Sequence, residues 1–189
     1  MDMGMSGFVK TTTVEWEGVV SSVIQLSKDG GDFDDAIDYL TERKAVIEGV
    51  ILDPIEGASP KELIALLKQL RSLGYRIRVT TDGSSPDVLD DLIGANYVDS
   101  VMVRLDGGID ASVMDTISIV TEYGLECEYR TILDGEKVTK DDIARYAKAI
   151  KGAKRYVLVQ SKRSPFKNKD ALEAAEAAKG YVKNVIIRQ

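Results

Sequence analysis

The sequence predicts an α/β fold, a partial (β/α)6 TIM-type barrel with parallel strands and outer helices. Short β-branched segments alternate with amphipathic helices along the whole chain, which indicates repeated βαβ units. Several strands have one apolar and one charged face, whereas strands covered by helices on both sides are nearly continuously apolar. No linker-like change of composition interrupts the 189 residues, so one domain spanning 1–189 is expected. A flat doubly wound sheet is the competing arrangement.

Seven segments have the apolar or alternating content of strands: 19–26, 50–52, 75–80, 98–105, 125–133, 155–160 and 182–187. Helices are expected between them. Asp32 or Asp34 caps the first, which continues to about Ala45. Ser59 begins the second with a proline and a glutamate in capping-box positions, and Gly74 ends it.

The later helices carry similar signals. Pro86 opens the third helix, and Asp110 caps the fourth, which Gly124 closes. Thr139 and Asp142 repeat the capping pattern before the fifth helix. An alanine-rich helix at about 169–179 precedes the last strand.

Three strands alternate between apolar and charged side chains. Arg78, Arg104, Glu128 and Arg130 fall on the polar faces of these strands. If the barrel prediction holds, they line a wet lumen in which they can pair. Exposure to solvent at an open edge explains any single one of them equally well.

The composition excludes several classes of function. A net charge of -6 argues against nucleic acid as a partner. No apolar run is long enough for a membrane span, and no secretion signal is recognisable, so we expect a cytoplasmic protein. The chain has no histidine and one cysteine, Cys127. A zinc site or a cysteine-ligated iron–sulfur cluster is therefore not expected, and no metal ligands are predicted.

The opening GFVKTTTVEWEGVVSSVIQL resembles the radical S-adenosylmethionine family, in the branch of anaerobic ribonucleotide reductase and glycyl-radical enzyme activating proteins. The resemblance continues through GVIL, LGYRIRVTTDGSSPDVLDDL, VDSVMVRLDG, EYRTIL and KGAKRYVLVQ, and thus covers nearly the whole chain. Each motif alone is weak, but their order and spacing are specific. The resemblance implies a partial six-unit barrel.

The chain departs from this family at the positions that carry its chemistry. The family has a CxxxCxxC loop after the first strand, whereas here Gln25 is followed by LSKDGGDFDD. The family's GGEP segment is replaced by DPIEG at 53–57. An aspartate and a lysine usual after the fourth strand are replaced by Arg104 and Asp106. The [4Fe–4S] cluster is therefore not expected, and binding of S-adenosylmethionine is doubtful.

Other positions match the cosubstrate-facing pattern of the family: Thr81 and Gly83, with Asp82 where asparagine is usual, and then Arg130 and Gln160. The first three also fit a strand-to-helix turn that needs glycine, and this simpler explanation is favoured. An internal ion pair is slightly favoured for Arg130.

Two functions follow from these observations. In the first, the chain is a catalytically degenerate relative that binds or regulates a partner, either a protein or another copy of itself. In the second, it is an enzyme with new, cluster-independent chemistry on a small anionic metabolite in the barrel lumen. There Arg78, Arg104, Arg130 and Lys162 bind the ligand, and Glu56 or Asp106 transfers protons. Solvated loops explain Lys162 and Glu56 more simply, and the catalytic groups remain open.

Overall fold

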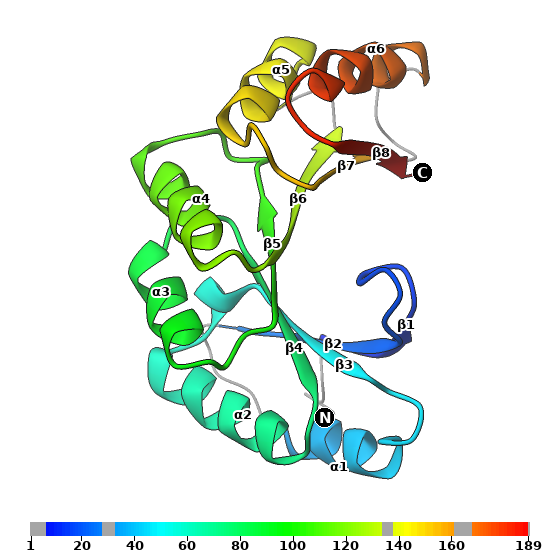
Figure 1. Cartoon of the computed structure of the whole chain (residues 1–189). Coiled ribbons are helices and arrows are strands. Elements are labelled where there is room, and N and C mark those ends of the chain that lie inside the picture. Colours follow the sequence, from blue (N-terminus) through cyan, green and yellow to red (C-terminus); the bar gives the residue numbers. More distant parts are fainter. Residues whose placement is uncertain (1–6, 28–32, 134–137, 161–167, 189) are drawn as a thin grey trace. The chain divides into compact units, whose positions relative to one another are not determined.

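The computed structural model describes residues 7–27, 33–133, 138–160 and 168–188. In this part of the chain, mostly parallel strands alternate with helices (Figure 1), which confirms the predicted α/β class. The strands are β1 (Phe8–Thr12), β2 (Ser21–Gln25), β3 (Gly49–Asp53), β4 (Arg76–Thr81), β5 (Ser100–Arg104), β6 (Glu126–Leu133), β7 (Arg155–Gln160) and β8 (Asn184–Arg188). The helices are α1 (Asp34–Glu42), α2 (Pro60–Ser72), α3 (Pro86–Gly94), α4 (Ala111–Tyr123), α5 (Lys140–Ala149) and α6 (Asn168–Lys179), with a short 3-10 helix η1 (Ile55–Gly57).

Contacts within the chain separate into two compact units. The first unit runs to Thr81 and resumes at 87–101, and the second unit contains 82–86 and everything from Met102 onward. The boundary falls within β5, between Val101 and Met102. The expectation of one domain stays a prediction, and each unit is described by itself below.

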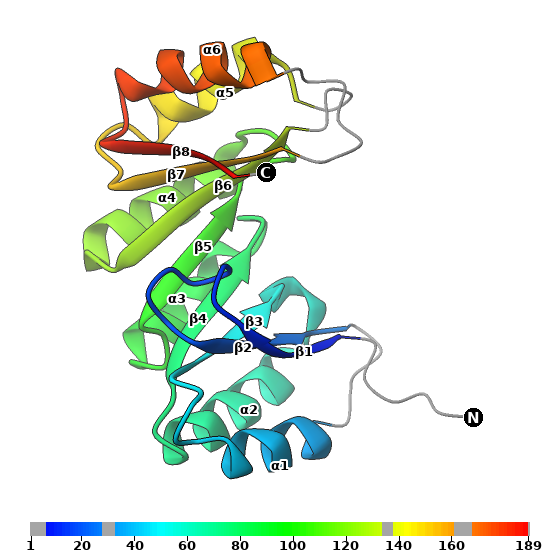
Figure 2. The same ribbon diagram turned by 90° about the vertical axis from the view of Figure 1, so that its right-hand side faces the viewer.

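In the first unit, β2, β3 and β4 are parallel neighbours. Val23 lies beside Ile51, which lies beside Arg78, so these three residues share one face of the sheet. Strand β1 pairs antiparallel with β2 (Figure 2) and was not predicted. Its central residues are exposed and mostly polar, so the apolar signal that marks a buried strand is missing.

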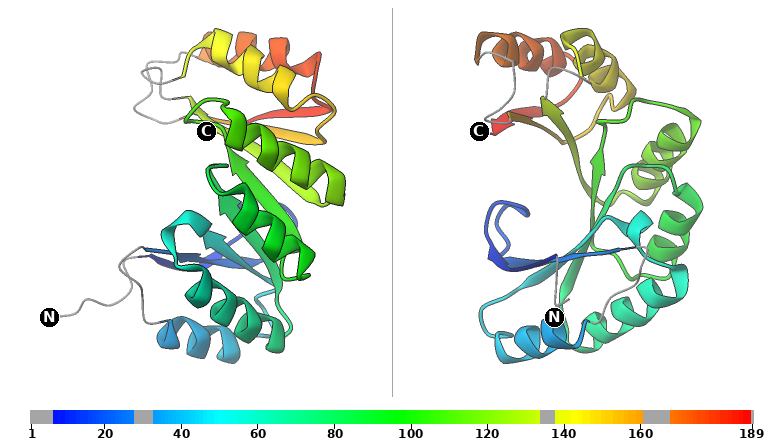
Figure 3. Two further views of the ribbon diagram at one scale, coloured as in Figure 1. Left: turned by 90° about the vertical axis from the view of Figure 1, so that its left-hand side faces the viewer. Right: turned by 180° about the vertical axis from the view of Figure 1, so that it is seen from behind.

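In the second unit, β6, β7 and β8 are parallel neighbours. The Leu105 amide donates to the Arg130 carbonyl at 2.9 Å, which joins the chain after β5 to β6. Helices α5 and α6 pack against each other, and α6 also contacts β7 and β8 (Figure 3).

The helix caps follow the sequence signals with one exception. Ser59 with Glu62, and Thr139 with Asp142, form capping boxes. Asp110 accepts a hydrogen bond from the Val113 amide. The predicted cap of α1 at Asp34 is wrong, because Phe33 occupies the cap position without a side-chain hydrogen bond and Asp34 lies inside the helix. Helix α1 also ends at Glu42, three residues before the predicted end.

Candidate functional site

Trp16 covers part of the sheet in the first unit. It lies in the segment between β1 and β2, is 1% exposed and packs with Val19, Val23 and Ile51. The guanidinium carbons of Arg76 and Arg78 lie 4.7 and 4.8 Å from the centroid of its ring. Arg78 and Ile51 are therefore buried beside this aromatic ring, whereas Arg76 stays exposed at the start of β4.

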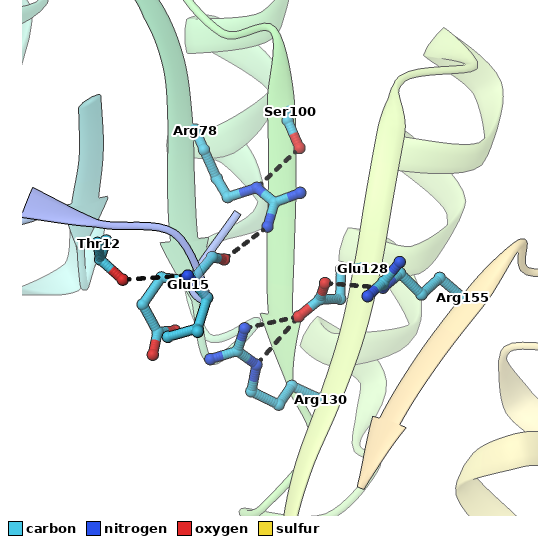
Figure 4. Close-up of polar contacts among 8 residues, drawn as sticks. Thr12, Glu15, Arg78, Ser100, Glu128, Arg130 and Arg155 are labelled. Carbon is cyan, nitrogen blue, oxygen red and sulfur yellow. Dashed lines mark hydrogen bonds and ion pairs between the residues drawn. The ribbon is translucent and has the colours of Figure 1, made fainter. Parts of the chain in front are cut away.

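Arg78 is held by hydrogen bonds within the same unit. Its Nε donates to Ser100 Oγ at 3.0 Å, and its Nη1 donates to the Glu15 carbonyl at 3.0 Å (Figure 4). The residue is 2% exposed. Burial of a cation requires such partners, and this cation has acceptors and an aromatic face. Its role in ligand binding stays a prediction, because the contacts already account for an arginine here.

A second polar group forms at the carboxyl ends of the strands of the first unit. Thr81, the last residue of β4, donates a hydrogen bond to Glu56 on η1. Gly57 packs against the end of β2, where a Cβ atom would lie 2.5 Å from the Leu26 carbonyl oxygen. Two predicted site residues, Glu56 and Thr81, are thus brought together, and their contact ties η1 to β4.

Asp82 and Gly83 form the turn between β4 and α3. Gly83 has a φ of +85°, and its carbonyl accepts from Thr116 Oγ1 at 3.2 Å. Asp82 Oδ1 accepts from the Ser84 amide at 2.9 Å. Burial raises the pKa of Asp82, but the hydrogen bonds from Ser84 and the charge of Arg104 outweigh it and lower the pKa. This geometry agrees with the turn explanation, and ligand binding by these residues stays a prediction.

Asp106 and Gln160 lie in the second unit. Asp106 Oδ1 accepts from the Ile132 amide at 2.6 Å, so this candidate acid–base group is fixed to the end of β6. Gln160 ends β7 beside Leu133 of β6. Lys162 lies outside the described residues.

Glu128 is the centre of an ion-pair network on β6 and β7. Its Oε1 lies 2.6 Å from Arg130 Nη2 and 3.1 Å from Arg130 Nε, and its Oε2 lies 3.0 Å from Arg155 Nε (Figure 4). Glu128 is 1% exposed and Arg130 9%. The predicted internal ion pair of Arg130 is present, and its partner is Glu128 itself.

Sequence reasoning missed two arginines of the second unit, Arg155 and Arg188. Tyr129 is paired with Tyr156, so Glu128 and Arg155 occupy equivalent positions one residue earlier. Arg188 is paired with Val159, which has the same parity along β7 as Arg155. The alternation that singled out Arg130 gives no signal here, because Val157 and Val159 share the face of Arg155 and Ile186 shares the face of Arg188.

Cys127 lies on the opposite face of β6. It lines a pocket of about 280 Å³ together with Tyr129, residues of α4 and the segment 150–154. Burial, followed by the interaction with Cys127, raises the pKa of Tyr129 far above its usual range. In the described part of the chain, no three histidine, cysteine, aspartate or glutamate side chains are grouped as a metal site would need. None of the described helices is long and apolar enough to cross a membrane.

No protein-family model matches this chain. A protein of Methanocaldococcus jannaschii named "Putative glycyl-radical enzyme activating enzyme MJ1227" is 25% identical over an alignment that covers 80% of this chain and 73% of that protein. This similarity is distant. A mutant tryptophan synthase alpha-subunit from Pyrococcus furiosus aligns over 87% of this chain and 75% of its own, with a TM-score of 0.51 and 15% identity. A second mutant of that subunit gives 0.49 at 14% identity, over the same shares of the two chains. The structure with a TM-score of 0.51 supports the TIM-barrel type of fold. At 15% identity it says nothing about the activity of this chain.

Proposed function

We propose that this chain is a cluster-free descendant of a radical S-adenosylmethionine activating protein and acts as a binding or regulatory protein. The observation that carries the proposal is the lack of thiolates where that family binds iron. The chain has one cysteine, and the segment after β2 contains none. Three cysteines hold the cluster in that family, so this chain cannot supply them by itself.

The position of Cys127 supports the same conclusion. It is the second residue of β6, whereas the family's cluster follows the first barrel strand, which corresponds to β2. Its side chain lines a pocket with residues of α4 and 150–154, on the other face of β6 from Glu128. A single thiolate in such a place does not make a cluster site.

The contacts of Glu56 and Thr81 also favour a binding role over inherited catalysis. DPIEG replaces the family's GGEP segment, and its glutamate accepts a hydrogen bond from Thr81. Gly57 of the same segment leaves no room for a side chain beside Leu26. The segment is therefore used to join η1 to the ends of β2 and β4.

Anaerobic reconstitution with iron and sulfide tests this proposal. We expect the purified protein to remain colourless, with well below one iron per chain after desalting. The absorbance at about 400 nm that thiolate-ligated clusters give should be missing. A Cys127→Ser variant serves as the control for adventitious iron at the single thiol. Stoichiometric iron in the wild-type chain that withstands desalting would overturn the proposal.

A further inference from the structure

The second unit contains a group of arginines on one face of its sheet. We call Arg130, Arg155 and Arg188 the arginine cluster. The parallel register places all three on the face that carries Glu128, because residues aligned between parallel strands point to the same side. The cluster thus spans β6, β7 and β8, and Glu128 contributes one carboxylate.

Arg188 differs from the other members of the cluster. Its Nη1 is buried, yet it has no hydrogen-bond partner among the described residues. A buried donor without an acceptor is costly, and the cost is larger for a charged group. The described residues therefore leave a cationic donor on this face that an anion could satisfy.

Arg155 and Arg188 both place a positive charge on this face of the sheet. Burial is the main cause that lowers the pKa of Arg155, and the positive charge of Arg188 lowers it further. The Cα atoms are separated by four residue positions along the strands, about 13 Å. Arg155 therefore lies at the start of β7 and Arg188 at the end of β8, on the same face of the sheet. An anion bound on this face would interact favourably with both charges.

We propose that the arginine cluster binds the phosphate group of a small anionic ligand. Guanidinium groups recognise phosphate through paired N–H donors, and Arg188 has a buried Nη1 donor without a hydrogen-bond partner among the described residues. Glu128 accepts a hydrogen bond from Arg130 and forms an ion pair with Arg155, and so holds their side chains in place. This inference specifies a ligand class for the proposed binding role and rests on that role.

Calorimetric titration with inorganic phosphate and pyrophosphate, at constant ionic strength, tests the site in the full chain. We expect saturable binding of one anion per chain, with pyrophosphate tighter than phosphate because it carries more charge. Arg188→Gln should weaken binding about tenfold or more, which is the loss of one charge-assisted hydrogen bond. The affinity of Arg188→Lys should lie between those of the wild-type chain and Arg188→Gln, since lysine keeps the charge without the planar pair of donors.

Arg145→Gln is the matched control. Arg145 lies in the same unit on α5, has a side chain that is 63% exposed and pairs with Asp142 at 2.7 Å. The substitution Arg145→Gln removes the same charge from the chain as Arg188→Gln. Because Arg145 is not part of the arginine cluster, phosphate binding should be unchanged. Circular dichroism melting of each variant separates loss of binding from loss of folding. If Arg188→Gln does not fold, Arg155→Gln measured in the same way takes its place.

Three results would overturn the site. They are no saturable binding by the folded wild-type chain, equal weakening by Arg145→Gln and Arg188→Gln, or unchanged binding in Arg188→Gln. The iron measurement is independent of these outcomes. If the protein stays colourless and does not bind phosphate, only the proposed phosphate site is contradicted. If the protein acquires a stoichiometric cluster, the proposed function is contradicted even when phosphate binds.

Discussion

Gly57 shows how closely two segments approach at the ends of β2 and β3. A Cβ atom there would lie 2.5 Å from the Leu26 carbonyl oxygen, which is backbone and cannot rotate away. We expect Gly57→Ala to lower the free energy of unfolding by about 1 to 3 kcal/mol, as overpacking usually does. Urea denaturation followed by circular dichroism measures the change.

Gly107→Ala is the control for this substitution. A Cβ atom at Gly107 meets nothing within 4 Å. Its effect should stay within about 0.5 kcal/mol, as for most surface substitutions. If the two variants were equally stable, the close packing of η1 against Leu26 would be refuted.

Glu128 is the second residue whose surroundings make a strong prediction. It is almost fully buried between Arg130 and Arg155. Glu128→Gln removes the anion and leaves two guanidinium groups beside a neutral amide, so we expect a loss of about 3 kcal/mol in the free energy of unfolding.

Glu176→Gln provides the comparison for Glu128→Gln. Glu176 pairs with Lys179 at 2.7 Å on the exposed side of α6. Surface pairs contribute about 0 to 1 kcal/mol, so this change should be small. Both variants are compared in one set of urea titrations. Similar small losses would mean that the Glu128 network contributes no more than a solvated ion pair.

At the scale of single elements, the start of α5 predicts a pH dependence. The side chain and then the backbone of Thr139 donate to Asp142, which lowers the pKa of that carboxyl below its ordinary value of 3.8. Because the pKa of Asp142 is lower in the folded state than in the unfolded state, the interaction stabilises the fold at pH values above the unfolded-state pKa. This stabilisation is lost as the pH falls from the unfolded-state pKa through the folded-state pKa.

Thr139→Ala should therefore reduce stability at neutral pH by about 1 kcal/mol and raise the pKa of Asp142. NMR titration of the Asp142 carboxyl measures the pKa, and urea denaturation at a series of pH values measures the stability. Ser59→Ala removes the equivalent cap of α2 and serves as the control. It should destabilise the chain without moving the pKa of Asp142. An unchanged Asp142 pKa in Thr139→Ala would contradict the capping geometry.

At the scale of the whole molecule, the two units share elements of the chain. The chain passes from one unit to the other after Thr81, after Pro86 and within β5. Unfolding of either unit would therefore disrupt a strand to which the other contributes residues. We expect a single cooperative transition.

Trp16 allows this expectation to be measured. It is the one tryptophan of the chain and is buried in the first unit. Its fluorescence should change at the same urea concentration as the far-UV circular dichroism, which follows both units. A fluorescence midpoint clearly separated from the dichroism midpoint would show that the units unfold independently.

How much the sequence could predict differs between these scales. Apolar periodicity and caps such as Ser59–Glu62 and Thr139–Asp142 are local signals, so most elements could be placed from the sequence. Strand β1 was missed because its central residues are exposed and mostly polar, so the strand has no apolar pattern.

The candidate site was less accessible to prediction. Alternation placed Glu128 and Arg130 on one face, but it could not show that Arg130 pairs with Glu128 rather than with another carboxylate. It also could not show that Trp16 packs on Arg78, because these residues are far apart in the chain. Pairing between distant side chains depends on register and depth of burial, which the sequence alone does not give.

The pairing of β1 with β2 has a consequence for solubility. Without β1, the mostly buried strand β2 would present its unpaired amide and carbonyl groups to other chains, which is a common route to aggregation. Strand β1 takes up that edge with a short, mostly polar sequence that contains Lys10 and two threonines. By pairing with β2, strand β1 therefore hinders self-association through the edge of β2, independently of any ligand or partner that the chain binds.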